Sequence, residues 1–140
     1  MVSHADLCGF TTETGQVMVA VGWLDPRGGF PVGAADPRLL PALTRLCYTH
    51  EQNLTRACYQ CPYCLAHHVF RDVPEIPGAR PVLLGNAEIH IVGPDGVAYA
   101  APTLVVHYVE EHGYLPPRPF VEAALWVDAR TPRELQEWNR

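Results

Sequence analysis

The sequence predicts an α+β fold with one β-hairpin followed by a helix, and with an additional strand and helix before them. Some stretches alternate apolar and polar side chains with a period of two, and others repeat apolar side chains every three or four residues. The 14 Pro and 11 Gly divide the chain into short elements. At 140 residues the chain is long enough for one domain core and too short for two ordinary ones. We therefore expect a single domain over 1–140, with the hairpin and its helix inside 58–115 and further helices at 117–140.

The N-terminal half is expected to contain one strand and one helix. Apolar side chains on both faces of Gln16–Leu24 predict a buried strand, and the Asp-Pro-Arg-Gly-Gly sequence at 25–29 predicts a turn. Asp36 is suited to cap a helix, Pro37 to begin it, and the leucines from Leu39 to Leu46 have helical spacing. A helix over Pro37–Tyr48 follows, and the three prolines of 72–81 predict a surface connection after it.

The C-terminal half has stronger local signals. Alternation over Glu88–Val92, the turn sequence Pro94-Asp95-Gly96 and a return strand at Val97–Ala100 predict a β-hairpin. A helix should follow from Pro102 to about His112, because Gly113 suits the left-handed residue that ends a helix. Two further helices are expected after an extended proline-rich link: Phe120–Val127, and a last one opened by the capping sequence Thr131-Pro132-Arg133-Glu134.

The cysteine pattern favours a metal site. Three of the five cysteines, Cys58, Cys61 and Cys64, lie within seven positions, where mutual disulfides would be strained. Cys8 and Cys47 stand apart, and we expect both to be small buried apolar side chains.

The order of the parts is that of a zinc finger or a treble clef: a Cys-x2-Cys knuckle, then the hairpin, then a helix with two histidines. Two cysteines separated by two residues can turn their sulfurs to one side, and helix histidines can complete a tetrahedron. The sequence therefore predicts one structural Zn²⁺ bound by Cys61, Cys64, His107 and His112.

Two features of this site depart from a classical finger. The chain between Cys64 and His107 is long, but closing the longer loop costs only about 1 kcal/mol, against apparent zinc binding free energies of about 10 kcal/mol or more. His107 and His112 would lie about 140° apart around an ideal helix. We therefore expect the last helical turn to loosen before Gly113.

Other sets of ligands and another chemistry also fit the pattern. His67, His68 and Glu111 compete for a ligand position. Cys58, Cys61, Cys64 and His68 have the spacing of an iron–sulfur cluster with one histidine, although no second cysteine group accompanies them. The Cys-Pro-Tyr-Cys sequence is similar to the redox motif of glutaredoxins, which belongs between a strand and a helix near the start of a βαβ unit.

Two longer stretches resemble a group of small bacterial proteins of unknown function. One is Val21-Gly-Trp-Leu24 with Phe30-Pro-Val-Gly33, and the other runs from Gly85-Asn-Ala-Glu-Ile89 into Tyr99–Pro117, which contains the sequence YAAPTLVVHYVEEHGYLPP. In that group the Cys-x2-Cys pair and the two helix histidines form the shared metal-binding set. The resemblance implies the same four ligands here and brings no activity with it, and Cys58 is a departure from the pattern.

Composition and charge exclude some classes of function. The formal charge of −5, with Glu110 and Glu111 on the histidine helix, argues against binding to nucleic acid. The longest apolar stretch, Val17–Leu24, is too short to cross a membrane, and the first residues do not resemble a signal peptide. We expect a soluble, cytoplasmic protein.

A zinc site closed by four protein ligands predicts an interaction or regulatory module with a protein partner. The candidate contact segment is Tyr114–Phe120. The alternative for this segment is a rigid spacer that packs Phe120 inward. The alternative is a small metal-dependent or thiol-based enzyme. In that case Glu88, His90 or the Gly85-Asn86 turn would face a cleft and supply acid and base groups.

Overall fold

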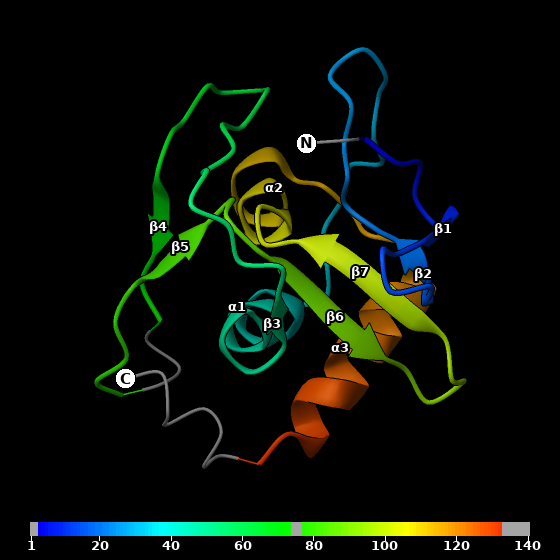
Figure 1. Cartoon of the computed structure of the whole chain (residues 1–140). Coiled ribbons are helices and arrows are strands. Elements are labelled where there is room, and N and C mark those ends of the chain that lie inside the picture. Colours follow the sequence, from blue (N-terminus) through cyan, green and yellow to red (C-terminus); the bar gives the residue numbers. More distant parts are fainter. Residues whose placement is uncertain (1–2, 74–76, 133–140) are drawn as a thin grey trace.

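The computed structural model describes residues 3–73 and 77–132, which form an α+β fold with two sheets and three helices (Figure 1). The larger sheet has the order β1-β2-β7-β6-β3. Its strands are β1 (Gly9–Thr11), β2 (Val17–Ala20), β7 (Ala98–Pro102), β6 (Glu88–Val92) and β3 (Glu51–Gln52). Only β2 and β7 pair in parallel, and the other neighbours are antiparallel.

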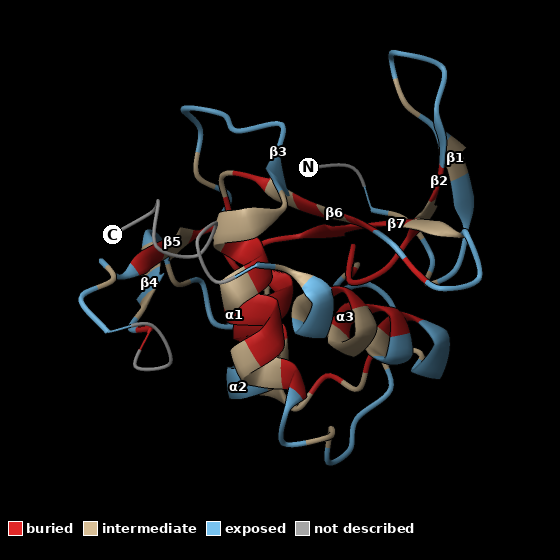
Figure 2. Cartoon of the chain, turned by 90° about the horizontal axis from the view of Figure 1, so that it is seen from below, coloured by how far each residue is buried: buried red, intermediate tan, exposed pale blue. Residues whose placement is uncertain are grey.

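The three helices all lie on the same side of this sheet, as Figure 2 shows. They are α1 (Leu39–Thr49), α2 (Val105–His112) and α3 (Arg118–Arg130). Helix α1 packs against α2 and α3, and both α1 and α3 contact β6. An ion pair of 2.6 Å between the Arg45 guanidinium and the Asp128 carboxylate joins α1 to α3.

Alternation along β6 decides which side of the sheet carries the core. Ile89 and Ile91 are buried on the helical side, whereas Glu88 and His90 lie on the other side and are only partly covered. The core continues into the helices through Leu43, Leu46, Tyr108 and Phe120, which are all fully buried. Among the described residues no helix covers the other face of the sheet, which we call the helix-free face.

In the described residues a second sheet pairs β4 (Val69–Arg71) antiparallel with β5 (Val82–Leu84). The proline-rich stretch predicted as a surface connection joins these two strands, and its described residues contain no regular structure. The sequence does not predict these two strands, nor does it predict β1 and β3. Each is two or three residues long, too short for a periodic pattern to appear.

The predicted hairpin and the helix after it are present as β6, β7 and α2, but β7 continues to Pro102, where the sequence predicts the start of the helix, and α2 begins at Val105. The N-terminal strand is shorter than the predicted Gln16–Leu24, because the chain turns at Gly22, whose φ is 81°. Helix α1 begins at Leu39, two residues later than predicted, and Asp36 accepts a hydrogen bond from the Arg38 backbone N–H just before it.

The last described helix differs from its prediction in length. It begins at Arg118 and ends at Arg130, so Pro119 lies in its first turn, where proline is tolerated, and not in an extended link. The final helix predicted from Thr131 would extend into 133–140, outside the described residues. None of the described helices has the length and apolar character needed to cross a membrane.

Two further expectations from the sequence are decided by burial. Cys47 is buried in α1 as expected, but Cys8 is exposed, because it lies just before the edge strand β1. The candidate contact segment Tyr114–Phe120 is not an exposed aromatic surface, since Tyr114 and Phe120 are both fully buried. The inward-packed spacer is the correct description of this segment.

Candidate metal centre

The knuckle at 61–64 is held by backbone hydrogen bonds around a tight turn. The N–H of Leu65 donates to the Cys61 carbonyl at 2.9 Å, and the N–H of Cys61 donates to the Ala66 carbonyl at 3.1 Å. Leu65 takes a left-handed conformation with φ 59°, which closes the turn. Both cysteines are thereby presented on the same side of the chain.

Helix α2 supplies the two histidines, and its position is fixed at its start by Thr103. The Thr103 hydroxyl accepts from the Gly85 N–H at 2.9 Å and donates to the Ala87 carbonyl at 3.2 Å. These bonds tie the beginning of α2 to the loop between β5 and β6. At the other end, α2 remains helical through His112, and the left-handed residue is Gly113, with φ 66°. The expected loosening of the last turn before Gly113 is therefore not found, and the two histidines come together from a turn that stays helical.

The four predicted ligands are brought together. One ligand atom from each of Cys61, Cys64, His107 and His112 lies within 4.8 Å of the others, and we call these four residues the metal-ligand cluster. The Nε2 of His107 is 3.3 Å from the Cys64 sulfur, and the Nε2 of His112 is 3.4 Å from the Cys61 sulfur. Tetrahedral zinc with usual bond lengths separates sulfur from nitrogen by about 3.5 Å. The donor set and its spacing thus fit a metal ion.

Aromatic side chains hold the knuckle against the helix. Tyr63, between the two cysteines, makes edge contacts with the rings of Phe30 at 5.1 Å and Tyr108 at 5.9 Å, and lies 5.5 Å from the His112 ring. The hydroxyl groups of Tyr63 and Tyr108 are buried and have no hydrogen-bond partner among the described residues. Only the three-dimensional packing reveals this aromatic support.

Burial sets the protonation preferences of two of the four ligands. Burial, and next the neighbouring His112, lower the pKa of His107, which favours the neutral imidazole that a metal requires. Burial raises the pKa of Cys61, while the backbone N–H groups of Cys64 and Tyr63 act in the opposite direction by donating to its sulfur. A bound cation would add to those N–H groups in stabilising the thiolate.

The competing ligands lie outside the cluster. His67, His68 and Glu111 are exposed, and the sulfur of Cys58 is 3.4 Å from the Leu84 carbonyl oxygen. The iron–sulfur arrangement therefore lacks two of its four predicted ligands. The redox motif lacks its expected context as well, because Cys64 is followed by the short strand β4 and not by a helix.

One side of the metal-ligand cluster is open to solvent. Cys64 is exposed, whereas Cys61 and His107 are buried. A cavity of about 620 Å³ reaches Cys64, His107 and His112, and Arg71 and Glu110 at its wall form an ion pair of 3.3 Å between β4 and α2. The ligands are thus accessible to an entering ion while the rest of the site is packed.

Comparison with known proteins gives a family and no activity. Residues 2–125, most of the chain, match the family described as "Domain of unknown function (DUF7919)". No curated protein and no solved structure matches the chain.

Proposed function

We propose that this chain, which belongs to the DUF7919 family, is an interaction or regulatory module held together by one structural zinc ion. The observation that supports the proposal is the close approach of the four ligand atoms in the metal-ligand cluster. Four protein ligands fill a tetrahedron and leave no position for water or substrate, as in structural zinc sites. Two thiolates with two imidazoles suit zinc among the common metals.

The proposal extends to the organisation of the chain and its compartment. We infer one domain, because side chains from β6, α1, α2 and α3 contribute to the same buried core. We place the protein in the cytoplasm, where reducing conditions keep ligand cysteines from forming disulfides. Nucleic acid is not the proposed partner, because a net charge of −5 repels phosphates.

The first expected result is one zinc ion per chain in protein purified without added metal, measured by elemental analysis. The Cys61→Ser variant should lose most of this zinc, because a hydroxyl replaces a buried thiolate ligand. The matched control is the variant Cys58→Ser. Because the Cys58 sulfur lies outside the cluster, this variant should keep the zinc content of the wild type. Protein that contains iron and sulfide, or equal zinc loss in both variants, would contradict the assignment.

We infer that the partner is a protein that contacts apolar side chains beside the knuckle. Leu65, directly after Cys64, is 65% exposed, and Phe70 on β4 is 61% exposed. Large exposed apolar side chains are a feature of protein contact surfaces. Their position next to the proposed zinc site would explain why the domain needs a metal to hold this region.

The contact surface is tested with the double variant Leu65→Asn and Phe70→Thr. Asn tolerates the left-handed conformation at 65, and Thr suits a strand, so fold and zinc content should be preserved. A protein captured by the wild type should bind this variant at least about tenfold more weakly. Val17→Thr is the control, since Val17 is 68% exposed on the distant strand β2. Equal binding to all three proteins would contradict the surface.

The alternative function, a small metal-dependent or thiol-based enzyme, is favoured by a single observation. The Cys64 thiol is exposed beside a cavity, where it could react with a small molecule. Against it, the pKa of the neighbouring Cys61 is raised by burial, whereas redox cysteines of this spacing have a lowered pKa.

A further inference from the structure

The helix-free face of the larger sheet carries a second candidate site. A cleft of about 820 Å³ lies over β6, between the N-terminal segment and the loop after β3. This volume is within the range of small-molecule sites. None of the four residues of the metal-ligand cluster lines the cleft. The site is therefore separate from the proposed zinc centre.

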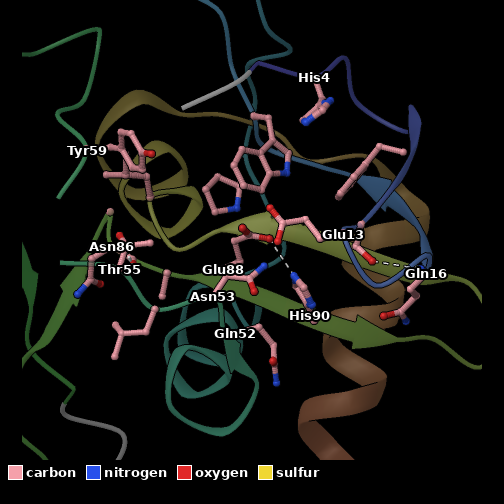
Figure 3. A pocket seen from close by; sticks show the side chains of 18 of the residues that line it. His4, Glu13, Gln16, Gln52, Asn53, Thr55, Tyr59, Asn86, Glu88 and His90 are labelled. Carbon is pink, nitrogen blue, oxygen red and sulfur yellow. Dashed lines mark hydrogen bonds and ion pairs between the residues drawn. The ribbon is translucent and has the colours of Figure 1, made fainter. Parts of the chain in front are cut away.

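Two polar side chains on β6 form the floor of the cleft. Glu88 and His90 are two residues apart, so they lie on the same face of the strand, and Figure 3 shows them turned toward each other. The His90 Nε2 is 2.8 Å from the Glu88 Oε1. Because a carboxylate only accepts hydrogen bonds, Nε2 donates the proton, and the contact fixes the orientation of the carboxylate.

The second carboxylate oxygen of Glu88 is left for a ligand. Within the described part of the chain, no hydrogen bond reaches Glu88 Oε2. The Glu88 side chain lines the cleft and is 24% exposed, so its carboxylate is partly withdrawn from water. A partly desolvated carboxylate oxygen binds a charged N–H donor more strongly than an exposed one.

The charges around the cleft favour a cation. The described lining contains two carboxylates, Glu88 and Glu13 at the rim, and no Lys or Arg. Its histidines, His4 and His90, carry positive charge only when protonated. An anionic ligand would therefore be repelled, and a cationic one attracted.

Aromatic side chains supply the apolar part of the wall. The ring of His4 stacks on Phe10 at 4.9 Å and meets Trp23 edge-on at 5.7 Å. The Trp23 indole N–H donates to the Ala100 carbonyl at 2.9 Å, which fixes the indole against the sheet. Tyr59 lines the opposite side of the cleft. Aromatic rings attract organic cations and pack against flat ligand bodies.

We propose that this cleft binds a small primary amine with an aromatic body. The ammonium group donates to Glu88 Oε2, His90 holds the carboxylate in place, and the body of the ligand lies against the aromatic wall. His90 is a positioning residue in this site. The ligand class follows from the missing Lys and Arg in the described lining together with the rigid aromatic wall.

The test is a titration of the zinc-loaded full chain with tyramine. Binding is measured by calorimetry and by the change in the NMR signal of the Trp23 indole N–H. Tyramine should saturate with a Kd below about 1 mM. The neutral 4-ethylphenol should bind about tenfold or more weakly, and the anionic 4-hydroxyphenylacetate should not bind, because only the amine completes the bond to Glu88.

Two variants locate the binding. Glu88→Gln keeps the side-chain shape and should raise the Kd for tyramine about tenfold, since the charged acceptor is lost. Glu122→Gln, on the exposed surface of α3, is the matched control and should leave the Kd unchanged. Equal binding of tyramine and 4-ethylphenol, unchanged binding to Glu88→Gln, or no saturable signal up to about 10 mM would overturn the proposal.

Discussion

Removing the metal from the purified protein should lower its melting temperature by about 10 °C or more, because the binding free energy of a structural zinc ion is also folding free energy. The metal-ligand cluster joins a knuckle to a helix across a long stretch of chain. Without the metal, the buried thiol of Cys61 and the buried imidazole of His107 would lose the ion that joins them to the other two ligands. A domain of this size has only about 5–15 kcal/mol of total stability to lose.

The same loss is expected for the variant His107→Ala, measured by thermal unfolding in the presence of zinc. His67→Ala is the control, because His67 is exposed and lies outside the cluster, and its melting temperature should stay within about 2 °C of the wild type. If a strong chelator removes the metal and the melting temperature does not change, the structural role is wrong. The metal-dependent enzyme would then be the better hypothesis.

The second large effect is expected at Phe120, the first core residue of α3. Phe120 is fully buried and makes an edge contact with the ring of Tyr99 at 5.9 Å. Phe120→Ala should lower the free energy of unfolding by about 3–5 kcal/mol, through lost burial and the cavity left behind. Denaturant unfolding of the zinc-loaded protein measures this change.

Val121→Ala is the control for Phe120, because its neighbour Val121 is only partly buried on the same helix. This variant should lose about 1 kcal/mol. Similar losses in the two variants would mean that Phe120 does not anchor the core.

The metal-ligand cluster and its supporting elements could be predicted because their signals are local. The turn at Pro94–Gly96 marks the hairpin, Gly113 marks the end of α2, and the Cys-x2-Cys spacing marks the knuckle. With these elements in order, the knuckle and the helix come together when one long loop closes. The entropy cost of closing a loop rises only slowly with its length.

The missed strands have no such local signal. Strand β3 contains only two residues, and its pairing of Glu51 with Ile89 is visible only after the chain has folded. Strands β4 and β5, in which Val69 pairs with Leu84, are also too short to show a pattern, and a long connection separates them. Tertiary pairing, and not propensity, decides such short strands.

The cleft was only partly predictable. Alternation placed Glu88 and His90 on one face of a strand, which solvent exposure explains equally well. The structure adds the N-terminal segment, which brings His4 and Phe10 over that face to meet Trp23. No pattern in the sequence indicates that contact, because it joins segments that do not share an element.

The most direct test of the central claim is X-ray absorption at the zinc edge of the protein as purified. If Cys61, Cys64, His107 and His112 bind the ion, the spectrum should show two sulfur ligands at about 2.3 Å and two nitrogen ligands at about 2.0–2.1 Å. The His107→Ala variant should lose one nitrogen ligand from this shell. A first shell of nitrogen and oxygen without sulfur, or one that is unchanged in His107→Ala, would contradict the proposed zinc site.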